Sequence, residues 1–429
     1  MKKQILLLTT IISSTALTAQ EFQEISTGAG YSKQAYIRIA DNHQTQVAND
    51  AWDIAFAVGP SDAGIFINES AGTGMGQVLP SFQLFDGGTD DFDATPDTSF
   101  AFQNPLFNSE KSWASGALNE VADPTNPFDF GWGVYDPTNH TIAGGRVFVA
   151  KLRNGQYLKF QVQSLASGTY SFRYANLDGT GETTKTIAKA DHAGRLLAYF
   201  SFNSGETVSV EPSDGFDLLF CRYVTPLEDG NGGTLNYAVT GILSGPGVEV
   251  AQADGIDPAT VVFDGYEDSL STDLDIIGHD WKTFDLATFQ WLLPEDRVYF
   301  VKTADGHLWK IRFIDFEGSS TGTATFEKTD LGLLNSVGDE HSPLDAFGVF
   351  PNPARSEAKL VFSVKNSVAG PTQVWLTDQF GRVVFQQKIQ VATGLNSLDI
   401  PVTNLPEGVY FLGLSIGNQR FTDKVVVVK

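Results

Sequence analysis

The histidines of this sequence are its best candidates for binding a metal ion or a metal cofactor. Imidazole is a ligand for zinc, copper and iron, and the chain contains six histidines. His140 lies in a loop after Trp132, and His279 lies beside Trp281. Both placements precede similar predicted hairpins, which singles out His140 and His279 as candidate ligands. A solvated loop position is the alternative for each, and it is favoured for the remaining candidates, which are His43, His192, His307, His341 and Met75.

Acidic and aromatic side chains offer two further kinds of site. Calcium prefers several oxygen ligands on a flexible loop, and four aspartates share one Gly-containing loop. Their spacing does not match the EF-hand pattern, so we favour a solvated loop and assign no metal site. Exposed aromatics stack on sugars, but most tryptophans of β-proteins fill the core. The residues concerned are Asp86, Asp90, Asp91 and Asp93, and Trp113, Trp132, Trp281, Trp291 and Trp309.

Several well-known catalytic motifs are absent from the sequence. It contains no His-Glu-x-x-His, no P-loop and no Gly-x-Gly-x-x-Gly after a predicted strand. Cys221 is the only cysteine and lies in the strand-like run 216–223, so we expect a buried, unreactive thiol. Paired carboxylates for glycoside hydrolysis stay open, since 51 acidic residues offer many pairs. We expect a protein that is not an enzyme.

Composition and charge indicate an acidic all-β protein of several domains. The chain has 429 residues, too many for one compact core, and Val, Ile, Thr, Phe and Tyr recur in short bursts between Gly, Asp and Asn. Of the net charge of −23, residues 1–19 and 345–429 each carry +2, which leaves −27 for residues 20–344. Repulsion therefore argues against nucleic acid or an anionic membrane as partner. Solubility alone also explains such a charge.

The N-terminal residues 1–19 have the features of a secretory signal peptide. Lys2 and Lys3 precede a short apolar stretch, and small residues lead to Ala19, a plausible last residue before cleavage. The apolar stretch is too short to span a bilayer, and no later segment has the roughly 20 apolar residues that a spanning helix needs. We expect an exported protein without a membrane-spanning segment.

A long internal repeat follows the signal. The strand-like run 35–39 precedes the run 52–56, and the run 198–202 precedes the run 216–220 at nearly the same spacing. Two similar hairpins also recur, with turns at Asn154-Gly155 and Asp305-Gly306, dipeptides that favour type I′ turns. We predict two homologous antiparallel β-domains at 20–185 and 186–332, one short helix around 186–197, and a linker at 333–344.

Residues 345–429 resemble the type A sorting domain of the type IX secretion system of Bacteroidetes-type Gram-negative bacteria. The resemblance rests on the blocks 350–354, 376–384 and 405–412 and on the terminal run 424–429. Alternating apolar and polar residues independently predict a small C-terminal β-sandwich. The resemblance implies recognition by the export machinery and display at the outer cell surface. The residues that carry the sorting signal are Pro351, Asn352, Pro353, Gly381, Gly408, Tyr410 and Lys424.

The tandem segments resemble the HmuY-type haem-binding proteins of the same bacterial group. The resemblance rests on the run 52–56, on the hairpin 298–313 and on the strand 322–326. It implies an all-β, hand-like domain that clamps haem through two axial side chains, usually histidines. The leading hypothesis is therefore a surface protein that binds haem through His140 and His279. The alternative is an adhesive or structural module that binds glycans or proteins.

Overall fold

The computed structural model describes most of the chain, and all of the described part is strand, short 3-10 turn or loop. No α-helix occurs among the described residues, so the prediction of an all-β protein is confirmed. The chain divides into two compact units: a front unit (1–58 and 63–335) and a sorting unit (59–62 and 336–429). The described residues are 21–70, 80–96, 104–334, 344–365, 372–379, 381–416 and 419–429. The predicted signal peptide, Met75, His341 and most of the predicted linker lie outside these ranges.

The front unit contains the strands β1 to β22, which fall into two consecutive sets. The first set is β1 (Glu21–Ser26), β2 (Lys33–Ile37), β3 (Gln44–Ala48), β4 (Ile54–Ala57), β5 (Ile65–Ile67), β6 (Gln83–Asp86), β7 (Gly133–Asp136), β8 (Thr141–Gly144), β9 (Val147–Lys151), β10 (Tyr157–Ala166) and β11 (Thr169–Asn176). The second set is β12 (Thr183–Ala188), β13 (Leu197–Ser201), β14 (Glu206–Val208), β15 (Leu218–Glu228), β16 (Thr234–Ser244), β17 (Glu249–Ala253), β18 (Thr283–Asp285), β19 (Gln290–Leu292), β20 (Val298–Lys302), β21 (His307–Phe316) and β22 (Thr323–Leu333). Short 3-10 turns lie at Ala29–Tyr31, Ala117–Asn119, Lys189–His192, Glu267–Ser269 and Gly318–Ser320.

With the exception of the β8–β10 pair, the strand pairings of the first set recur in the second with each strand number raised by eleven among the described residues. β4 pairs with β5 as β15 pairs with β16, and β6 pairs with β9 as β17 pairs with β20. The hairpins β7–β8 and β18–β19 correspond in the same way, as do β10–β11 and β21–β22. The internal repeat that the sequence indicates is therefore present in the topology, strand for strand, among the described residues.

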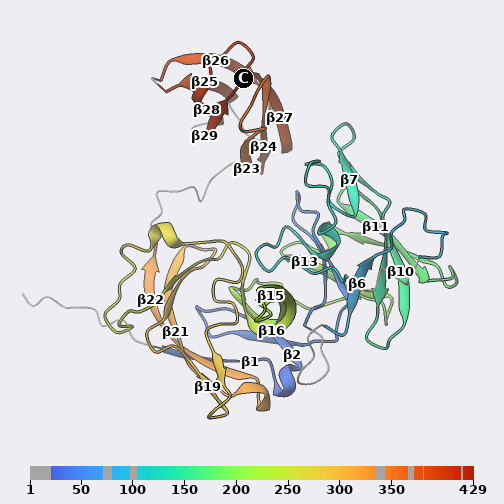
Figure 1. Ribbon diagram of the computed structural model, residues 1–429, viewed down its shortest axis with the longest axis vertical. Coiled ribbons are helices and arrows are strands. Elements are labelled where there is room, and N and C mark those ends of the chain that lie inside the picture. The colour runs from blue at the N-terminus through green and yellow to red at the C-terminus, as the bar shows by residue number, and fades with distance from the viewer. Residues whose placement is uncertain are drawn as a thin grey trace, which may run out of the picture. The chain divides into compact units, whose positions relative to one another are not determined.

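Three strands of each set cross over to the other set. β2 pairs with β15 and, reciprocally, β13 pairs with β4. β1 pairs along its length with β22, as β12 pairs with β11. One sandwich therefore consists of β4–β14 and the other of β15–β22 completed by β1–β3, so the blue N-terminal strands lie with the yellow and orange ones (Figure 1). Strands of the segments 20–185 and 186–332 thus interleave, and their status as two homologous domains stays a prediction.

The predicted helix around 186–197 is wrong. Residues 183–188 form β12, whose backbone pairs with β11 from Thr183 to Ala188, and only the 3-10 turn Lys189–His192 follows. Three threonines in this strand are β-branched, which favours an extended backbone. Pairing with β11 therefore outweighs the weak helical preference of the alanines and lysines.

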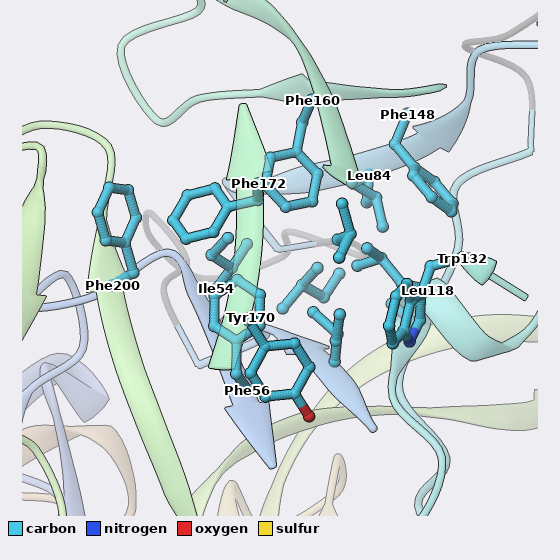
Figure 2. Close-up of a cluster of buried hydrophobic side chains, with 14 of the residues drawn as sticks. Ile54, Phe56, Leu84, Leu118, Trp132, Phe148, Phe160, Tyr170, Phe172 and Phe200 are labelled. Carbon is cyan, nitrogen blue, oxygen red and sulfur yellow. The ribbon is translucent and has the colours of Figure 1, made fainter. Parts of the chain in front are cut away.

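Each sandwich packs around a large aromatic core. In the first, Trp132 is fully buried with Phe56, Tyr170 and Phe172 between the two sheets (Figure 2). In the second, Trp281 takes the equivalent place and stacks on Phe313 at 4.2 Å between ring centroids. The two tryptophans thus anchor in the core the chain that precedes the hairpins β7–β8 and β18–β19.

The inner sheets of the two sandwiches pack face to face. Tyr36 meets Phe216 edge-on at 4.9 Å, and the equivalent pair, Trp52 and Tyr199, meets at 5.0 Å with the same interplanar angle of 76°. The Tyr36 and Tyr199 hydroxyls lie 3.3 Å apart where the two copies meet. In the described residues of the front unit, four of the five sheets thus form a stack, with β18–β19 as a separate two-stranded sheet, and the cluster of these buried side chains joins the two halves.

Two equivalent aspartates close the crossed pairings. The Asp53 carboxylate accepts a hydrogen bond from the Phe202 amide at 2.7 Å, and the Asp217 carboxylate accepts one from the Ile39 amide at 2.8 Å. Burial raises the pKa of both carboxyl groups, against an opposing effect of Arg153 on Asp53 and of the Ile39 amide on Asp217. Each aspartate satisfies a backbone N–H at the end of a pairing, which explains why Asp recurs at this position of the repeat.

Glu69 ties the first sandwich to the second at the free edge of β15. Its two carboxyl oxygens accept hydrogen bonds from the Asn108 amide at 2.8 Å and from the Val224 amide at 3.1 Å. The Ser70 hydroxyl donates to the Arg222 carbonyl at 2.9 Å, so Glu69 and Ser70 replace a strand partner where β2 has ended. Burial raises the pKa of Glu69 to about 8, because the two amides offset only part of the desolvation.

Replacing Glu69 with glutamine should flatten the dependence of stability on pH. Between pH 4.5 and about 8 the folded protein holds a proton on Glu69 that the unfolded chain releases. The wild-type free energy of unfolding therefore falls as pH rises through this window, by at most about 1.4 kcal/mol per pH unit from this group. Glu69→Gln removes that slope although it also loses one amide bond. Urea unfolding at several pH values measures the difference between the two curves, with exposed Glu228→Gln as control; parallel curves for Glu69→Gln and wild type would contradict the assignment.

The sorting unit is a small sandwich of seven strands in its described residues. One sheet has the order β23-β24-β27 and the other β26-β25-β28-β29, so the predicted C-terminal sandwich is confirmed. Its core is aliphatic, with Leu360, Leu412 and Val425 fully buried. The strands are β23 (Leu344–Phe350), β24 (Glu357–Val364), β25 (Thr372–Asp378), β26 (Val383–Ile389), β27 (Gly394–Pro401), β28 (Gly408–Ile416) and β29 (Gln419–Val427).

Candidate functional site

Two hairpins in equivalent places of the repeat carry the most chemically distinctive surface side chains. β7–β8 follows Trp132 and β18–β19 follows Trp281. His140 and Phe289 stand at the same position in the two turns, both with φ of 56°. Their amides make the same hydrogen bond, from His140 to the Asp136 carbonyl at 2.9 Å and from Phe289 to the Asp285 carbonyl at 2.8 Å. The two turns therefore share one backbone but present different side chains.

The β7–β8 hairpin presents a histidine–tyrosine pair. His140 is exposed, and its Nδ1 lies 2.8 Å from the hydroxyl of half-buried Tyr135. Burial and the neighbouring Asp136 raise the pKa of Tyr135, which keeps its hydroxyl protonated. In the tautomer whose Nδ1–H donates to the Tyr135 hydroxyl oxygen, the His140 Nε2 presents a lone pair that can bind a metal. Exposed Phe128 and Val134 lie on the same hairpin region, with the Phe128 and Tyr135 rings 6.1 Å apart.

His279 lies elsewhere and is not the counterpart of His140. It precedes Trp281 in a half-buried loop, where a methyl group on Gly241 would come within 3.0 Å of its Cα. Burial and then the Lys282 ammonium lower the pKa of His279, which favours its neutral form. The sequence placed both histidines near a tryptophan, but one follows it and the other precedes it. The structure therefore does not bring His140 and His279 to equivalent positions.

The β18–β19 hairpin presents apolar side chains instead. Leu286 is 77% exposed and Phe289 is 75% exposed, and Phe284 and Leu292 are also exposed. Beneath them lies the Lys282 ammonium, 4.4 Å from the Trp281 ring centroid. Burial lowers the pKa of Lys282 to about 7. Sequence reasoning missed Tyr135 and Phe289, although the spacing from each tryptophan to the following Asp and turn residue was available to align the two hairpins.

The remaining histidines and the loop aspartates are held by local contacts. His43 lies 3.3 Å from the Thr45 hydroxyl, and His307 lies in the hairpin turn 3.7 Å from Asp305. Burial lowers the pKa of His192. In the acidic loop, Asp86 and Asp91 each accept a hydrogen bond from an amide two residues later. Across the described residues, no group of three or more His, Cys, Asp or Glu side chains is arranged to hold a metal ion.

The tryptophans proposed for sugar stacking are not exposed. Trp132, Trp281 and Trp309 are buried, and Trp113 and Trp291 are half-buried, with the Trp113 indole donating to the Ser244 carbonyl at 2.9 Å. Cys221 is buried, as expected, and burial raises its pKa to about 12. These side chains belong to the packing of the sheets, so they give no support to a glycan platform.

A cavity between the two inner sheets is too small for a cofactor such as haem. Its volume is about 60 Å³, whereas small-molecule sites usually have roughly 300–1,000 Å³. Glu69, Tyr36 and Trp52 are among its lining residues, and no histidine is.

In the sorting unit, Asn352, Gly408 and Tyr410 among the predicted signal residues lie against the last strand. Asn352 bridges to β29: its amide donates to the Lys424 carbonyl at 2.6 Å, and its carbonyl accepts from the Val426 amide at 2.8 Å. The Tyr410 hydroxyl donates to the Pro406 carbonyl at 2.8 Å. Gly381 has φ of 79° in the β25–β26 turn, a conformation that favours glycine. These contacts show how the blocks are held; their part in recognition stays a prediction.

Comparison with known proteins identifies the sorting unit. No curated protein matches the chain. Apo PinO from Porphyromonas gingivitis is 10% identical with a TM-score of 0.21, over 74% of this chain and 100% of that chain. A putative lipoprotein from Bacteroides fragilis is 14% identical with a TM-score of 0.16, over 46% of this chain and 95% of that chain. Latent PorU from Porphyromonas gingivalis is 9% identical with a TM-score of 0.19, over 95% of this chain and 34% of that chain.

These structural scores are too low to support any inference about the front unit. The sequence comparison is more specific, because residues 348–428 match the family model of the secretion system C-terminal sorting domain. No helix in the described part of the chain is long and apolar enough to cross a membrane. Residues 348–428 are thus a type IX secretion sorting domain, which directs the chain across the outer membrane to the cell surface or the medium.

Proposed function

We propose that the exported protein binds haem at the β7–β8 hairpin, with His140 as the iron ligand, and that it does so without catalysis. The observation that carries the proposal is the Tyr135–His140 pair, joined at 2.8 Å on an exposed turn. The resemblance of the tandem segments to HmuY-type proteins supports the same ligand. Haem would supply a flat apolar ring and an iron atom that accepts a nitrogen ligand.

The surroundings of His140 fit this ligand. With the His140 Nδ1–H donating to the Tyr135 hydroxyl oxygen, the ring is oriented and Nε2 is left as the coordinating atom, and this hydrogen bond also raises the basicity of a ligating imidazole. Exposed Phe128 and Val134 supply apolar surface for the ring beside the hairpin. His279 has no such surroundings, and Phe289 replaces the histidine in the second hairpin. We therefore propose one haem per chain, not two.

Replacing His140 with alanine should abolish saturable haem binding. Titration of the chain lacking residues 1–19 with haem, followed by absorbance, should give a sharp Soret band that saturates at one haem per chain. His140→Ala removes the iron ligand and should lose that band, whereas Tyr135→Phe keeps the ring and should weaken binding about tenfold, because one orienting hydrogen bond is lost. His279→Ala is the matched control and should bind like wild type. Equal loss in both histidine variants, or no saturation in wild type, would remove this site.

Adhesion to another protein is the second candidate function, and the β18–β19 hairpin favours it. Leu286, Phe289 and Leu292 place exposed apolar side chains on one hairpin, the kind of surface that marks protein contacts. The Phe284 and Phe289 rings meet at 72°, so they form no flat row for a sugar. A protein partner is therefore favoured over a glycan.

The double variant Leu286→Ser with Phe289→Ser should reduce binding of the labelled chain to immobilised extracellular matrix proteins by at least about tenfold, since burial of two large side chains is lost. Val134→Ser on the other hairpin is the control. Undiminished binding of the double variant, or retention on a glycan array instead, would count against this function.

Export should depend on the sorting unit. Deletion of residues 345–429 should leave the protein in the periplasm, because the machinery has no sorting domain to recognise. Cell fractionation and protease accessibility of intact cells measure the location, with the full-length His140→Ala variant as a control for export of an altered chain. Surface display of the deletion variant at the level of wild type would overturn the dependence.

A further inference from the structure

Arg222 is a buried arginine without an acidic partner. It lies near the middle of β15, and only 8% of its surface is exposed. Its backbone carbonyl accepts a hydrogen bond from the Ser70 hydroxyl, but its guanidinium donates none and makes no ion pair among the described residues. Burial therefore lowers the pKa of Arg222. A buried charge without a counter-charge is costly, because no partner offsets its desolvation.

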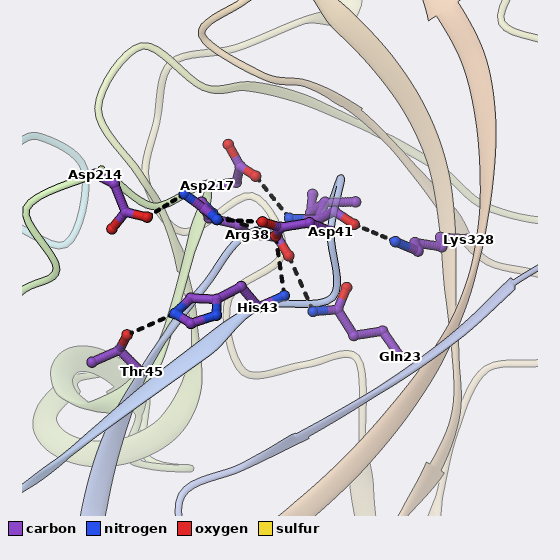
Figure 3. A network of polar contacts seen from close by, with 9 residues as sticks. Gln23, Arg38, Asp41, His43, Thr45, Asp214, Asp217 and Lys328 are labelled. Carbon is purple, nitrogen blue, oxygen red and sulfur yellow. Dashed lines mark hydrogen bonds and ion pairs between the residues drawn. The ribbon is translucent and has the colours of Figure 1, made fainter.

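The other arginines of the front unit all have partners. Arg38 pairs with Asp41 and Asp214 (Figure 3). The remaining six each donate at least one hydrogen bond to a side chain or a carbonyl; they are Arg146, Arg153, Arg173, Arg195, Arg297 and Arg312. Residues 20–344 carry a net charge of −27, so carboxylates are abundant in this unit. A shortage of acidic side chains therefore does not explain why Arg222 has none.

Two tyrosine hydroxyls lie close enough to this guanidinium to act on it electrostatically. They belong to Tyr31, which ends the 3-10 turn before β2, and to Tyr237 on β16, and both oppose the effect of burial on the pKa of Arg222. Neither hydroxyl makes a hydrogen bond within the described part of the chain. A guanidinium can only donate hydrogen bonds, and each phenol has one to donate. The three groups together therefore suit a hydrogen-bond acceptor.

Tyr31 is held firmly in its place. Its φ of 55° is a left-handed conformation that is rare for a large side chain. Its carbonyl accepts a hydrogen bond from the Asn49 amide group at 2.5 Å, and its ring lies parallel to that of Phe316, with 6.4 Å between the centroids. Such conformations persist where the surrounding contacts enforce them, and they cluster at ligand sites. The Tyr31 hydroxyl is thus positioned before any ligand binds.

The charged end of Arg222 can be reached from solvent. Fully buried polar atoms without a partner occur at Gln34 Nε2 and at the Tyr223 hydroxyl, but not at the Arg222 guanidinium. Since the guanidinium nitrogens also have no partner in the described residues, they must keep contact with solvent. The exposed 8% of Arg222 therefore includes its charged end, and a small anion can approach it without separating the strands.

We propose that Arg222, Tyr31 and Tyr237 bind the carboxylate group of a small organic acid that carries a single negative charge. The planar guanidinium matches a carboxylate through two parallel N–H donors, and the phenols donate to the same oxygens. One negative charge balances the charge of Arg222, whereas phosphate would bring a second one into a unit that is already strongly negative. The site is built on β15, β16 and the turn Ala29–Tyr31, so it does not depend on the functions proposed for the hairpins β7–β8 and β18–β19.

Fluorine NMR of trifluoroacetate measures carboxylate binding to the chain lacking residues 1–19. We expect a saturable shift of the resonance that sodium acetate reverses and that sodium chloride or phosphate at equal ionic strength does not. Arg222→Gln should abolish the saturable shift, because the charge and both N–H donors are lost. Tyr31→Phe keeps the ring beside Phe316 and should weaken binding about tenfold through loss of one hydrogen bond to a charged group. Arg195→Gln removes a cation elsewhere in the same unit and, as the matched control, should bind like wild type.

Urea unfolding separates binding from a structural role of Arg222. Without ligand, Arg222→Gln should keep or raise the urea midpoint, because the variant removes an unpaired buried charge. Acetate should raise the midpoint of wild type but not that of the variant, since a ligand stabilises only the chain that binds it. A lower midpoint for Arg222→Gln would assign the side chain to structure and overturn the proposal. The same holds for binding that survives in Arg222→Gln, for equal loss in Arg195→Gln, for displacement by chloride or phosphate as effective as by acetate, and for no saturable shift in wild type.

Discussion

The crossed pairing of β2 with β15 and of β13 with β4 is the interaction on which the front unit depends. The inner sheets exist only when these distant segments meet, and the pairing of β1 with β22 likewise joins the two ends of the front unit. Tyr36 and Tyr199, the aspartates Asp53 and Asp217, and Glu69 all lie at this crossing. Because closing long loops costs chain entropy, the front unit should form as a whole and not as two successive domains.

This crossing also explains why buried acidic groups are tolerated in so negatively charged a unit. Asp53, Asp217 and Glu69 each accept hydrogen bonds from backbone amides that no strand satisfies. An unsatisfied buried amide would cost about 1–3 kcal/mol, which is comparable with the cost of burying a carboxyl group that is protonated or hydrogen-bonded. These carboxyl groups thus satisfy backbone N–H groups at the ends of strand pairings. Their raised pKa values follow from the burial that this role requires.

Local patterns predicted much of this structure, and they failed where the answer depended on distant partners. The turns at Asn154-Gly155 and Asp305-Gly306 mark hairpins that form as expected, and the sorting unit was recognisable from its motifs. The crossing of β1–β3 and β12–β14 to the other set of strands was not predictable, because a strand with alternating apolar and polar residues fits either sheet equally well. The prediction that His140 and His279 are equivalent rested on their proximity to tryptophan along the chain. In the structure, the residue at the position equivalent to His140 is Phe289.

The pairing of β1 with β22 brings the first and the last strand of the front unit together. The strand pairings therefore form a closed cycle, which the polypeptide chain interrupts only between these two strands. The turn 177–182 joins the paired strands β11 and β12. The equivalent pair is β22 and β1, in which Glu21 pairs with Lys328 near the end of β22. The two ends of the front unit therefore emerge from a single edge. The same geometry means that circular permutation, with new ends in the turn 177–182, would preserve every strand pair.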